Sequence, residues 1–271
     1  MAGDVGKVAA VDIGGSGCRA AWVDLRADGR HVVGAVHRLE SVGSRSELAQ
    51  ALTRSLGHVD RLGISTAGFV DSQSGVVTLC RVQPWLMGQV RARMEQCLAS
   101  ARVAVANDGE AHLLAHLGES LMHPAICLSL GTSVGFGMTN DAGHVSRPRA
   151  DLNWDIGAMR VRTRASNGDL WWALGSHGLA ELQHDMGDAP GTRHYGMRLG
   201  GLIRDLSILF RPRTVILAGG IAARHADTLV AACETELRES KPEYMELPAL
   251  VLSPFGETSG LVGAAVAASK L

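Results

Sequence analysis

Three short glycine-rich segments constrain the fold of this 271-residue chain more than any other feature of its sequence. Each follows a run of small and branched apolar residues, which indicates a buried strand that ends in a tight loop. Glycine lets backbone N–H groups approach a ligand closely, and neighbouring hydroxyls add donors, so such loops are typical of phosphate sites. One loop alone is equally well explained as a turn, but three in order favour phosphate binding. They span residues 12–17, 130–133 and 218–220, and none contains the Gly-Lys-Ser/Thr or Gly-x-Gly-x-x-Gly nucleotide motifs.

Strands and helices alternate around these loops. A helix is predicted to begin after Ser44, whose hydroxyl can cap it, with Glu47 completing a capping box. Two α/β halves, each opening with an apolar strand that runs into a glycine loop, predict a duplicated two-domain fold with a cleft between the domains. The predicted strands are 8–13, 20–25, 62–65, 103–106, 125–130 and 214–218, the predicted helices 45–56, 90–100, 109–117, 170–184, 195–210 and 260–269, and residues 140–144 form a hairpin tip.

Charge and composition exclude several classes of protein. Lys and Arg total 26 against 27 Asp and Glu, without a long basic run, which argues against binding nucleic acid through phosphates. The longest uncharged stretch, residues 124–139, is too short and too polar to span a bilayer, and the first residues lack a signal-peptide pattern. The five cysteines are scattered without a Cys-x-x-Cys pair. The sequence therefore predicts a cytoplasmic protein with reduced thiols that binds neither nucleic acid nor membrane.

Polar residues end two of the predicted strands. Asp12 ends the first, and Asn107 and Asp108 follow the strand at 103–106. A carboxylate in the position of Asp12 can hold a hydrated Mg²⁺. For Asp108 the residues alone favour a structural role, because Asp is a good N-cap for the predicted helix 109–117.

The ordered set of motifs resembles the ROK (repressor, ORF, kinase) family of sugar kinases, whose fold is actin-like. The resemblance implies an α/β fold of two actin-like (ribonuclease H-like) domains of duplicated topology, with an active-site cleft between them. It places an N-terminal domain at 1–108, a C-terminal domain at 109–258, and a C-terminal helix at 259–271 that packs back on the first domain. The segments that carry it are 12–21, 63–77, 103–112, 128–137, 215–222 and 261–268, and the first is most similar to the zinc-less polyphosphate/ATP glucokinase branch.

The resemblance also implies a role for each matching residue. Asp108 corresponds to the general base, and Asp12 to the residue that holds Mg²⁺ through water. ATP is the implied donor, with polyphosphate left open, and the implied assembly is a homodimer. The donor-binding positions are Asp12, Gly14, Gly15, Ser16, Gly131, Thr132, Ser133, Gly219 and Gly220, and the acceptor-binding positions are Gly68, Asn107, Asn153, Asp155 and Glu181.

The sequence departs from the family at the acceptor and zinc motifs. The family's Glu-x-Gly-His aligns with residues 155–158, where the acid is Asp155 and the histidine is Ala158; residues 141–144 match the letters better but lie in the predicted hairpin tip. The three zinc cysteines correspond to Trp172, Leu174 and Leu179, so we expect no structural zinc and a small hydrophobic cluster instead.

These features predict an ATP-dependent kinase that phosphorylates a hydroxyl of a hexose, a modified sugar or a cyclitol. The alternative is a catalytically silent sugar-binding or regulatory protein without a DNA-binding domain, since the first loop already begins at residue 12. His112 and His116 are predicted to lie on a helix surface, His177 to be structural, and Cys18 to be a buried structural thiol.

Overall fold

The computed structural model describes residues 4–15, 17–99, 101–117, 121–162 and 167–271. The chain forms two compact units. Unit 1 consists of Met1–Ser120, Arg147–Trp154 and Thr258–Leu271, and unit 2 consists of Leu121–Ser146 and Asp155–Glu257. Unit 1 thus extends past the predicted boundary at residue 108 and includes a short segment, Arg147–Trp154, that the sequence analysis did not assign to it.

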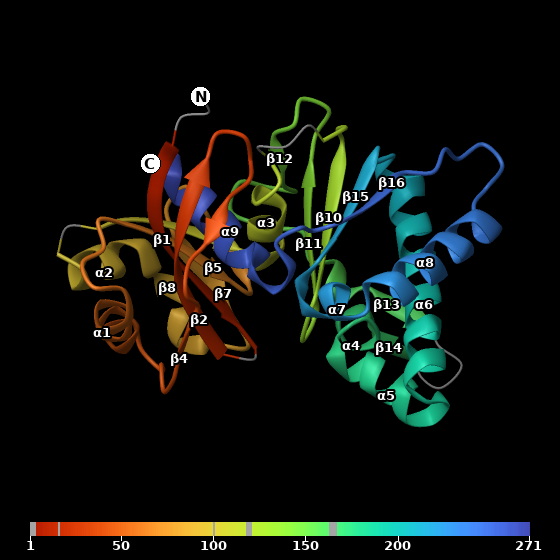
Figure 1. Ribbon diagram of the computed structural model, residues 1–271, viewed down its shortest axis with the longest axis horizontal. Helices are drawn as coiled ribbons and strands as arrows, with labels where there is room; N and C mark the ends of the chain where they lie inside the picture. Colours follow the sequence, from red (N-terminus) through yellow and green to blue (C-terminus); the bar gives the residue numbers. More distant parts are fainter. Residues whose placement is uncertain (1–3, 16, 100, 118–120, 163–166) are drawn as a thin grey trace. The chain divides into compact units, whose positions relative to one another are not determined.

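The sheet of unit 1 brings three polar strand ends to one edge (Figure 1). Strand β1 pairs antiparallel with β2 and parallel with β5, and β5 pairs parallel with β9. The register sets Ile13 level with Thr66 and Thr66 level with Asn107, so the carboxyl ends of β1, β5 and β9 meet. The strands are β1 (Asp4–Gly14), β2 (Gly17–Arg26), β3 (Val32–Val33), β4 (His37–Leu39), β5 (Arg61–Thr66) and β9 (Arg102–Asn107).

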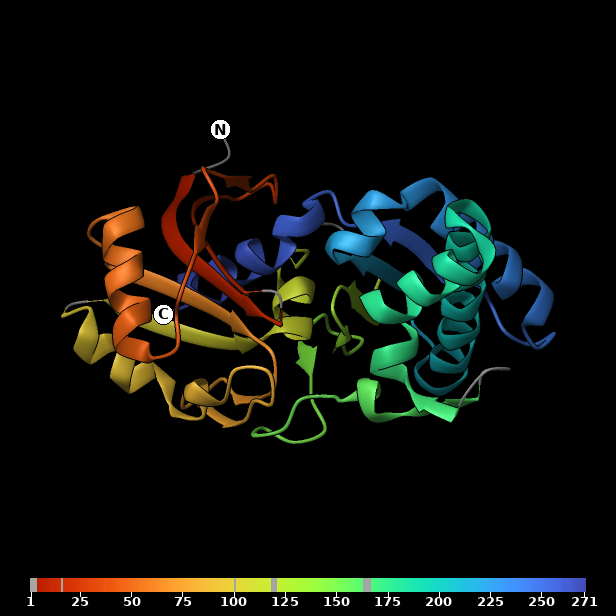
Figure 2. The same cartoon turned by 90° about the horizontal axis from the view of Figure 1, so that it is seen from below.

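Helices cover both faces of this sheet (Figure 2). Helices α1 (Arg45–Leu56) and α2 (Val90–Cys97) pack on one face around a core that includes Leu48, Leu52 and Met94. Helix α9 (Ser259–Ser269) packs on the other face, together with α3 (Asp108–Leu114). A small sheet of β6 (Phe69–Asp71), β7 (Val76–Leu79) and β8 (Gly88–Gln89), and a 3₁₀ turn η1 (Pro84–Leu86), complete the unit.

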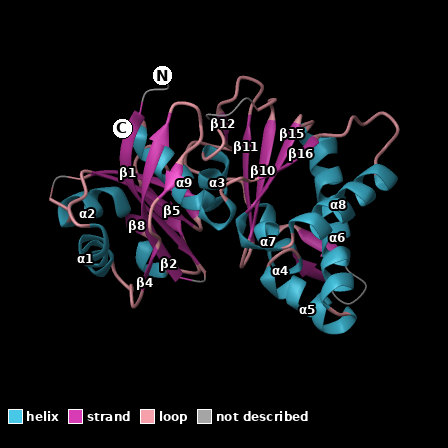
Figure 3. Ribbon diagram, in the orientation of Figure 1, coloured by secondary structure: helices cyan, strands magenta, loops and turns pink. Residues whose placement is uncertain are grey.

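Unit 2 repeats the pattern of an antiparallel pair followed by parallel strands (Figure 3). Strand β10 (Ala125–Leu130) pairs antiparallel with β11 (Val134–Thr139) and parallel with β15 (Thr214–Ala218). The predicted α/β fold with duplicated topology is confirmed. The other elements are β12 (Val145–Ser146), β13 (Arg160–Arg162), β14 (Asn167–Asp169), β16 (Ala249–Leu252), η2 (Ile156–Ala158), α4 (Leu170–Ala173), α5 (Ser176–Met186), α6 (Asp188–Phe210), α7 (Gly219–Arg224) and α8 (Ala226–Ser240), and a 3₁₀ turn η3 (Gly256–Thr258) follows β16.

Most predicted elements are confirmed, including the cap of α1, where Ser44 Oγ accepts from Glu47 N. The helix predicted at 170–184 is instead two helices, because the chain turns at Gly175, where a side chain would lie 2.4 Å from the carbonyl oxygen of Thr132. Helix α6 begins seven residues before its predicted start at 195. Within the described ranges, none of the helices has the length and apolar character that crossing a bilayer requires.

The prediction that His112 and His116 lie on a helix surface is wrong. Their exposed fractions are 8% and 0%, and only His112 belongs to α3. Helix α9 covers this side of α3 so closely that a Cβ at Gly263 would lie 1.6 Å from the carbonyl oxygen of Ala111. His112 Nδ1 lies 2.5 Å from Ser259 Oγ, and burial lowers the pKa of His112.

The contact between α9 and the sheet predicts the effect of Gly63→Ala. A Cβ at Gly63 would lie 1.9 Å from the carbonyl oxygen of Ala264, so the variant should lose about 1–3 kcal/mol of unfolding free energy. Gly201→Ala is the matched control, because no atom lies within 4 Å of that Cβ position and alanine favours a helix such as α6. Guanidinium unfolding measures both, and a Gly63→Ala protein as stable as the control would contradict the packing.

Candidate active site

Asp12 lies at the carboxyl edge of the unit 1 sheet with its charge compensated. Arg19, which faces it across the β1–β2 pair, donates from Nη2 to Asp12 Oδ2 at 2.8 Å, and Ser65 Oγ donates to Oδ1 at 2.8 Å. A Cβ at Gly260 would lie 2.9 Å from Oδ1, so the first turn of α9 also contacts the carboxylate. The positive end of a helix favours a negative charge in this position.

These contacts leave Asp12 suited to a hydrated cation. A carboxylate offers roughly four lone-pair positions, of which Arg19 and Ser65 occupy two. Mg²⁺ usually keeps several waters and is held by one or two carboxylates together with substrate phosphates, which fits contact through water. Among the described residues, no three His, Cys, Asp or Glu side chains gather into a metal site. The Mg²⁺ role of Asp12 stays a prediction.

The first predicted phosphate loop follows directly. Gly14 ends β1, and a Cβ there would meet no atom within 4 Å, while Ser16 lies outside the described residues. Gly17 begins β2 with φ of 123°, a left-handed conformation that favours glycine. Cys18 is buried as predicted, and burial raises the pKa of its thiol to about 11.

Asn107, and not Asp108, caps helix α3. Asn107 Oδ1 accepts from Glu110 N at 3.3 Å, and its Nδ2 donates to the carbonyl oxygen of Gly68 at 2.8 Å and to Asp108 Oδ1 at 3.1 Å. The alternative that Asp108 is the N-cap is therefore wrong. Gly68 has φ of 101°, and a Cβ there would lie 2.0 Å from the carbonyl oxygen of Leu79, so only glycine fits.

Asp108 is the first residue of α3, and its environment favours the protonated form more than water does. Burial raises the pKa of Asp108 from 3.8 to about 6, and the negative charge of Asp12 acts in the same direction. Hydrogen bonds from Gly109 N, at 2.9 Å, and from Asn107 oppose this rise and hold Oδ1 in place. A carboxylate with this pKa is still largely ionised at neutral pH, yet it is a stronger base than an ordinary aspartate.

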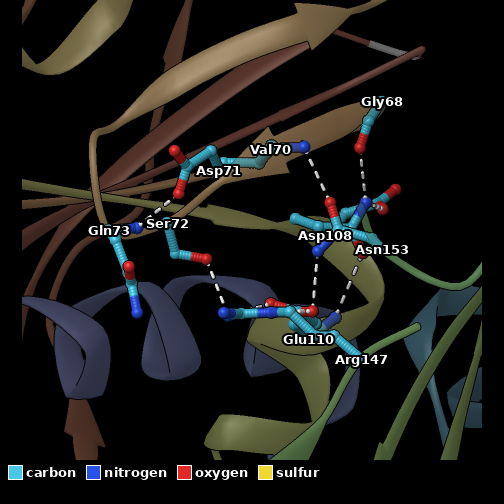
Figure 4. Close-up of polar contacts among 10 residues, drawn as sticks. Gly68, Val70, Asp71, Ser72, Gln73, Asp108, Glu110, Arg147 and Asn153 are labelled. Carbon is cyan, nitrogen blue, oxygen red and sulfur yellow. Dashed lines mark hydrogen bonds and ion pairs between the residues drawn. The ribbon is translucent and has the colours of Figure 1, made fainter. Parts of the chain in front are cut away.

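A buried ion pair adjoins this carboxylate (Figure 4). Glu110, in the first turn of α3, is 1% exposed. Arg147 donates from Nε to Glu110 Oε1 at 2.6 Å and from Nη2 to Oε2 at 2.7 Å, and Nη2 also reaches Ser72 Oγ at 2.7 Å. This bidentate geometry is the strongest form of the Arg–carboxylate pair.

Asn153 joins the same network. Its Nδ2 donates to Glu110 Oε1 at 2.6 Å, and its Oδ1 accepts from Val70 N at 2.7 Å (Figure 4). Both ends of the buried amide are thus engaged, and the segment Arg147–Trp154 is fixed to α3 and β6.

The sequence analysis did not identify Glu110 and Arg147 as part of this network. A glutamate among the small and apolar residues that follow Asp108 is the available signal for Glu110, but nothing in the sequence indicates its partner.

The phosphate-loop residues of unit 2 lie at the ends of two neighbouring parallel strands. Gly131 N donates to the carbonyl oxygen of Ser133 at 3.0 Å, and Thr132 and Ser133 are exposed. Gly219, with φ of 87°, lies so close that a Cβ would be 2.6 Å from the carbonyl oxygen of Leu130. Gly220 follows in the first turn of α7. A cavity of about 240 Å³ adjoins Gly219, and its lining includes Leu217, Ala222, Ala223, Ala226, Ser253 and Pro254.

The predicted acceptor residues are divided between the two units. Gly68, Asn107 and Asn153 belong to unit 1, as does Asp108. Asp155, just before η2, and Glu181, on α5, are exposed side chains of unit 2. The roles of these residues, and the cleft between the domains, stay predictions.

No protein-family model matches this sequence, and no curated protein matches it either. Solved structures do. The ROK family glucokinase from Streptomyces griseus, in complex with glucose and AMPPNP, is 21% identical, with a TM-score of 0.79 over 98% of this chain and 100% of that one. The inorganic polyphosphate/ATP-glucomannokinase from Arthrobacter sp. strain KM is 21% identical, with a TM-score of 0.70 over 96% and 97%.

The chain has the ROK sugar-kinase fold. The same fold occurs in a ROK family transcriptional regulator, a homologue of the E. coli Mlc protein, which is 18% identical with a TM-score of 0.73 over 96% of this chain and 77% of that one. The resemblance found in the motifs is thus confirmed for the fold, which occurs in kinases and in a regulator alike.

At the ROK zinc positions the expected hydrophobic cluster forms only in part. Leu174 and Leu179 are buried, but Trp172 is 42% exposed. Its indole stacks on the ring of His177, with centroids 4.5 Å apart and planes inclined by 3°. The lack of zinc stays a prediction.

The ion pair of Glu110 predicts a large and specific loss of stability. Glu110→Ala leaves Arg147 partly buried without its carboxylate, which should cost about 3–5 kcal/mol of unfolding free energy. Arg238→Ala is the control, because its pair with Glu234 is exposed and contributes about 0–1 kcal/mol. Denaturant unfolding of both variants checks this, and similar losses would show that the buried pair does not stabilise the unit.

Proposed function

We propose that the chain is an ATP-dependent kinase that transfers the γ-phosphate to a hydroxyl of a hexose, a modified sugar or a cyclitol, with Asp108 as the general base. The observation that carries this proposal is the state of Asp108. It begins α3 at the edge where the parallel strands end, and its pKa is raised to about 6. The helix is capped by Asn107, so the carboxylate of Asp108 is not the cap.

Asp108 accepts the proton of the attacking hydroxyl. Gly109 N and Asn107 Nδ2 fix its Oδ1, so the carboxylate is oriented before the acceptor binds. The donor phosphates lie on Gly14 and Gly15 and on the loop from Gly131 to Ser133, and the adenosine lies beside Gly219 and Gly220. Asp12 would hold Mg²⁺ through water, and the ion would supply positive charge that offsets the charge of the donor phosphates. Polyphosphate remains an alternative donor.

The exposed carboxylates of Asp155 and Glu181 bind hydroxyls of the acceptor. Gly68, Asn107 and Asn153 belong to the same proposed acceptor site, and the hydrogen bonds of the two asparagine amides within unit 1 hold Asp108 and the segment Arg147–Trp154 in place. Because the acid at 155 is short and Ala158 stands where the resemblance implies histidine, we propose an acceptor altered at the corresponding end: a modified hexose, an amino sugar or a cyclitol. The enzyme acts in the cytoplasm as a homodimer.

A sugar-binding regulator without catalysis is the second candidate. The observation that favours it is the shared fold with the ROK transcriptional regulator. The two candidates differ at Asp108, since a sensor has no need for a base of raised pKa.

Asp108→Asn tests the kinase directly. The variant keeps the size and the N–H contact at this position but cannot take a proton, so transfer to a panel of hexoses, amino sugars and cyclitols should fall by about 10²–10⁴-fold. Donor binding should change little. Mass spectrometry of the products and calorimetric titration with ATP·Mg²⁺ measure the two. Equal transfer by both proteins refutes the base, and native protein that binds ATP yet phosphorylates nothing favours the regulator.

The raised pKa of Asp108 predicts an unusual acid limb. Below about pH 6 the carboxyl is protonated, so kcat/KM should rise about tenfold per pH unit and level off above that value. A limb centred near the ordinary pKa of about 4 contradicts the assignment.

The same shift predicts how stability depends on pH. Because the pKa of Asp108 is higher in the folded than in the unfolded protein, this residue stabilises the fold below about pH 4, and the contribution is lost as the pH rises through 6. In Asp108→Asn the free energy of unfolding, measured at pH 4 and pH 7, should lack this decrease.

A further inference from the structure

Unit 2 exposes three rings at the corner between α4 and α5. Trp171 and Trp172 are 40% and 42% exposed. Trp172 stacks on His177, and the two tryptophans meet edge to face, with centroids 5.7 Å apart and planes inclined by 86°. Tryptophan is largely buried in most proteins, so an exposed pair favours a surface that binds a ligand or a partner. We call Trp171, Trp172 and His177 the aromatic corner.

The backbone of the corner rests on the second predicted phosphate loop. Ser176 N, at the start of α5, donates to the carbonyl oxygen of Gly131 at 2.8 Å. A Cβ at Gly175 would lie 2.4 Å from the carbonyl oxygen of Thr132. The corner is therefore fixed directly beside the place where we propose the transferred phosphate lies.

The corner also adjoins both proposed acceptor carboxylates. A Cβ at Gly157 would lie 3.2 Å from Trp171 Cβ and 3.4 Å from Asp155 Oδ1, so Trp171 and Asp155 are neighbours across this glycine. Glu181 follows His177 by one turn of α5. The rings and the carboxylates thus come from adjoining segments of unit 2.

We propose that the aromatic corner is an acceptor subsite that binds a second, flat-faced ring of the substrate, so that the acceptor is a glycoside and not a free monosaccharide. This inference rests on the proposed kinase function. The carbon-bound face of a sugar or an aryl ring packs on the indole, while the hydroxyls of the phosphorylated ring reach Asp155 and Glu181. Because His177 holds Trp172 by stacking, little side-chain freedom is lost on binding.

The adenine ring of the donor fits the aromatic corner less well than a ring of the acceptor does. The predicted adenosine loop at Gly219 has its own cavity, which is lined by α7, the start of α8 and the chain after β16 and by none of the three rings. A second copy of the chain is the remaining alternative, and the experiment below distinguishes it.

The test compares matched pairs of phenyl and methyl glycosides of glucose, mannose and galactose, in both anomers. Native protein should bind a phenyl member about tenfold more tightly than its methyl partner, by tryptophan fluorescence without donor and by KM in the transfer assay. Trp172→Ala and His177→Ala should bring this ratio close to one. Tyr244→Ala is the control, because Tyr244 is an exposed aromatic (66%) of unit 2 outside the corner, and it should leave the ratio unchanged.

Equal binding of both members in every pair overturns the subsite, whether or not transfer occurs. So does a native dimer that sediments as a monomer once Trp172 is replaced, with the phenyl preference intact, since the corner is then an interface. A phenyl preference that depends on Trp172, without phosphorylation of any glycoside, supports the subsite and counts against the kinase. The failures of the two proposals are thus distinguishable.

Discussion

The side chain of Asn107 is the point on which the geometry of unit 1 depends. One amide caps α3, fixes the loop at Gly68, and holds Oδ1 of Asp108. Without this amide, Asp108 Oδ1 would lose one of its hydrogen bonds, and the carbonyl oxygen of Gly68 would lose the donor of Asn107. The amide can do all three because the carboxyl ends of β5 and β9 lie level, which places Thr66 beside Asn107. Sheet register therefore helps to determine where the carboxylate of Asp108 lies.

The buried pair of Glu110 and Arg147 extends this order to a distant part of the chain. A buried ion pair costs desolvation that an apolar pair would avoid, so its retention calls for a role beyond stability. Here it determines which segment packs on α3. The chain leaves unit 2 after Ser146, contributes Arg147–Trp154 to unit 1, and returns to unit 2 at Asp155. An apolar contact would tolerate slippage of this segment, whereas a two-point Arg–carboxylate bond and the amide of Asn153 fix its register.

The sequence predicts the architecture well because its main signals are local. Strands that end in glycine loops, the cap at Ser44 and the order of the motifs each depend on a few neighbouring residues. The errors arise where distant contacts decide. His112 and His116 have the spacing of surface residues but are buried, and His112 contacts Ser259 of α9, which comes from the far end of the chain. The break at Gly175 depends on the carbonyl of Thr132, and the partner of Glu110 lies 37 residues away. The exposed stack of Trp172 likewise follows from packing that no periodicity reveals.

Asp12 and Asp108 lie at the same edge of the sheet, but their carboxylates have different surroundings. Asp12 is paired with Arg19, accepts from Ser65 and lies at the start of α9, so its negative charge is compensated from three directions. Asp108 has no such cation as a hydrogen-bond partner among the described residues, and burial together with the charge of Asp12 raises its pKa to about 6. A compensated carboxylate suits a hydrated cation, and one of raised pKa suits proton transfer. The proposed division of roles depends in part on a short distance between Asp12 and Asp108, because the negative charge of Asp12 adds to the rise that burial causes in the pKa of Asp108.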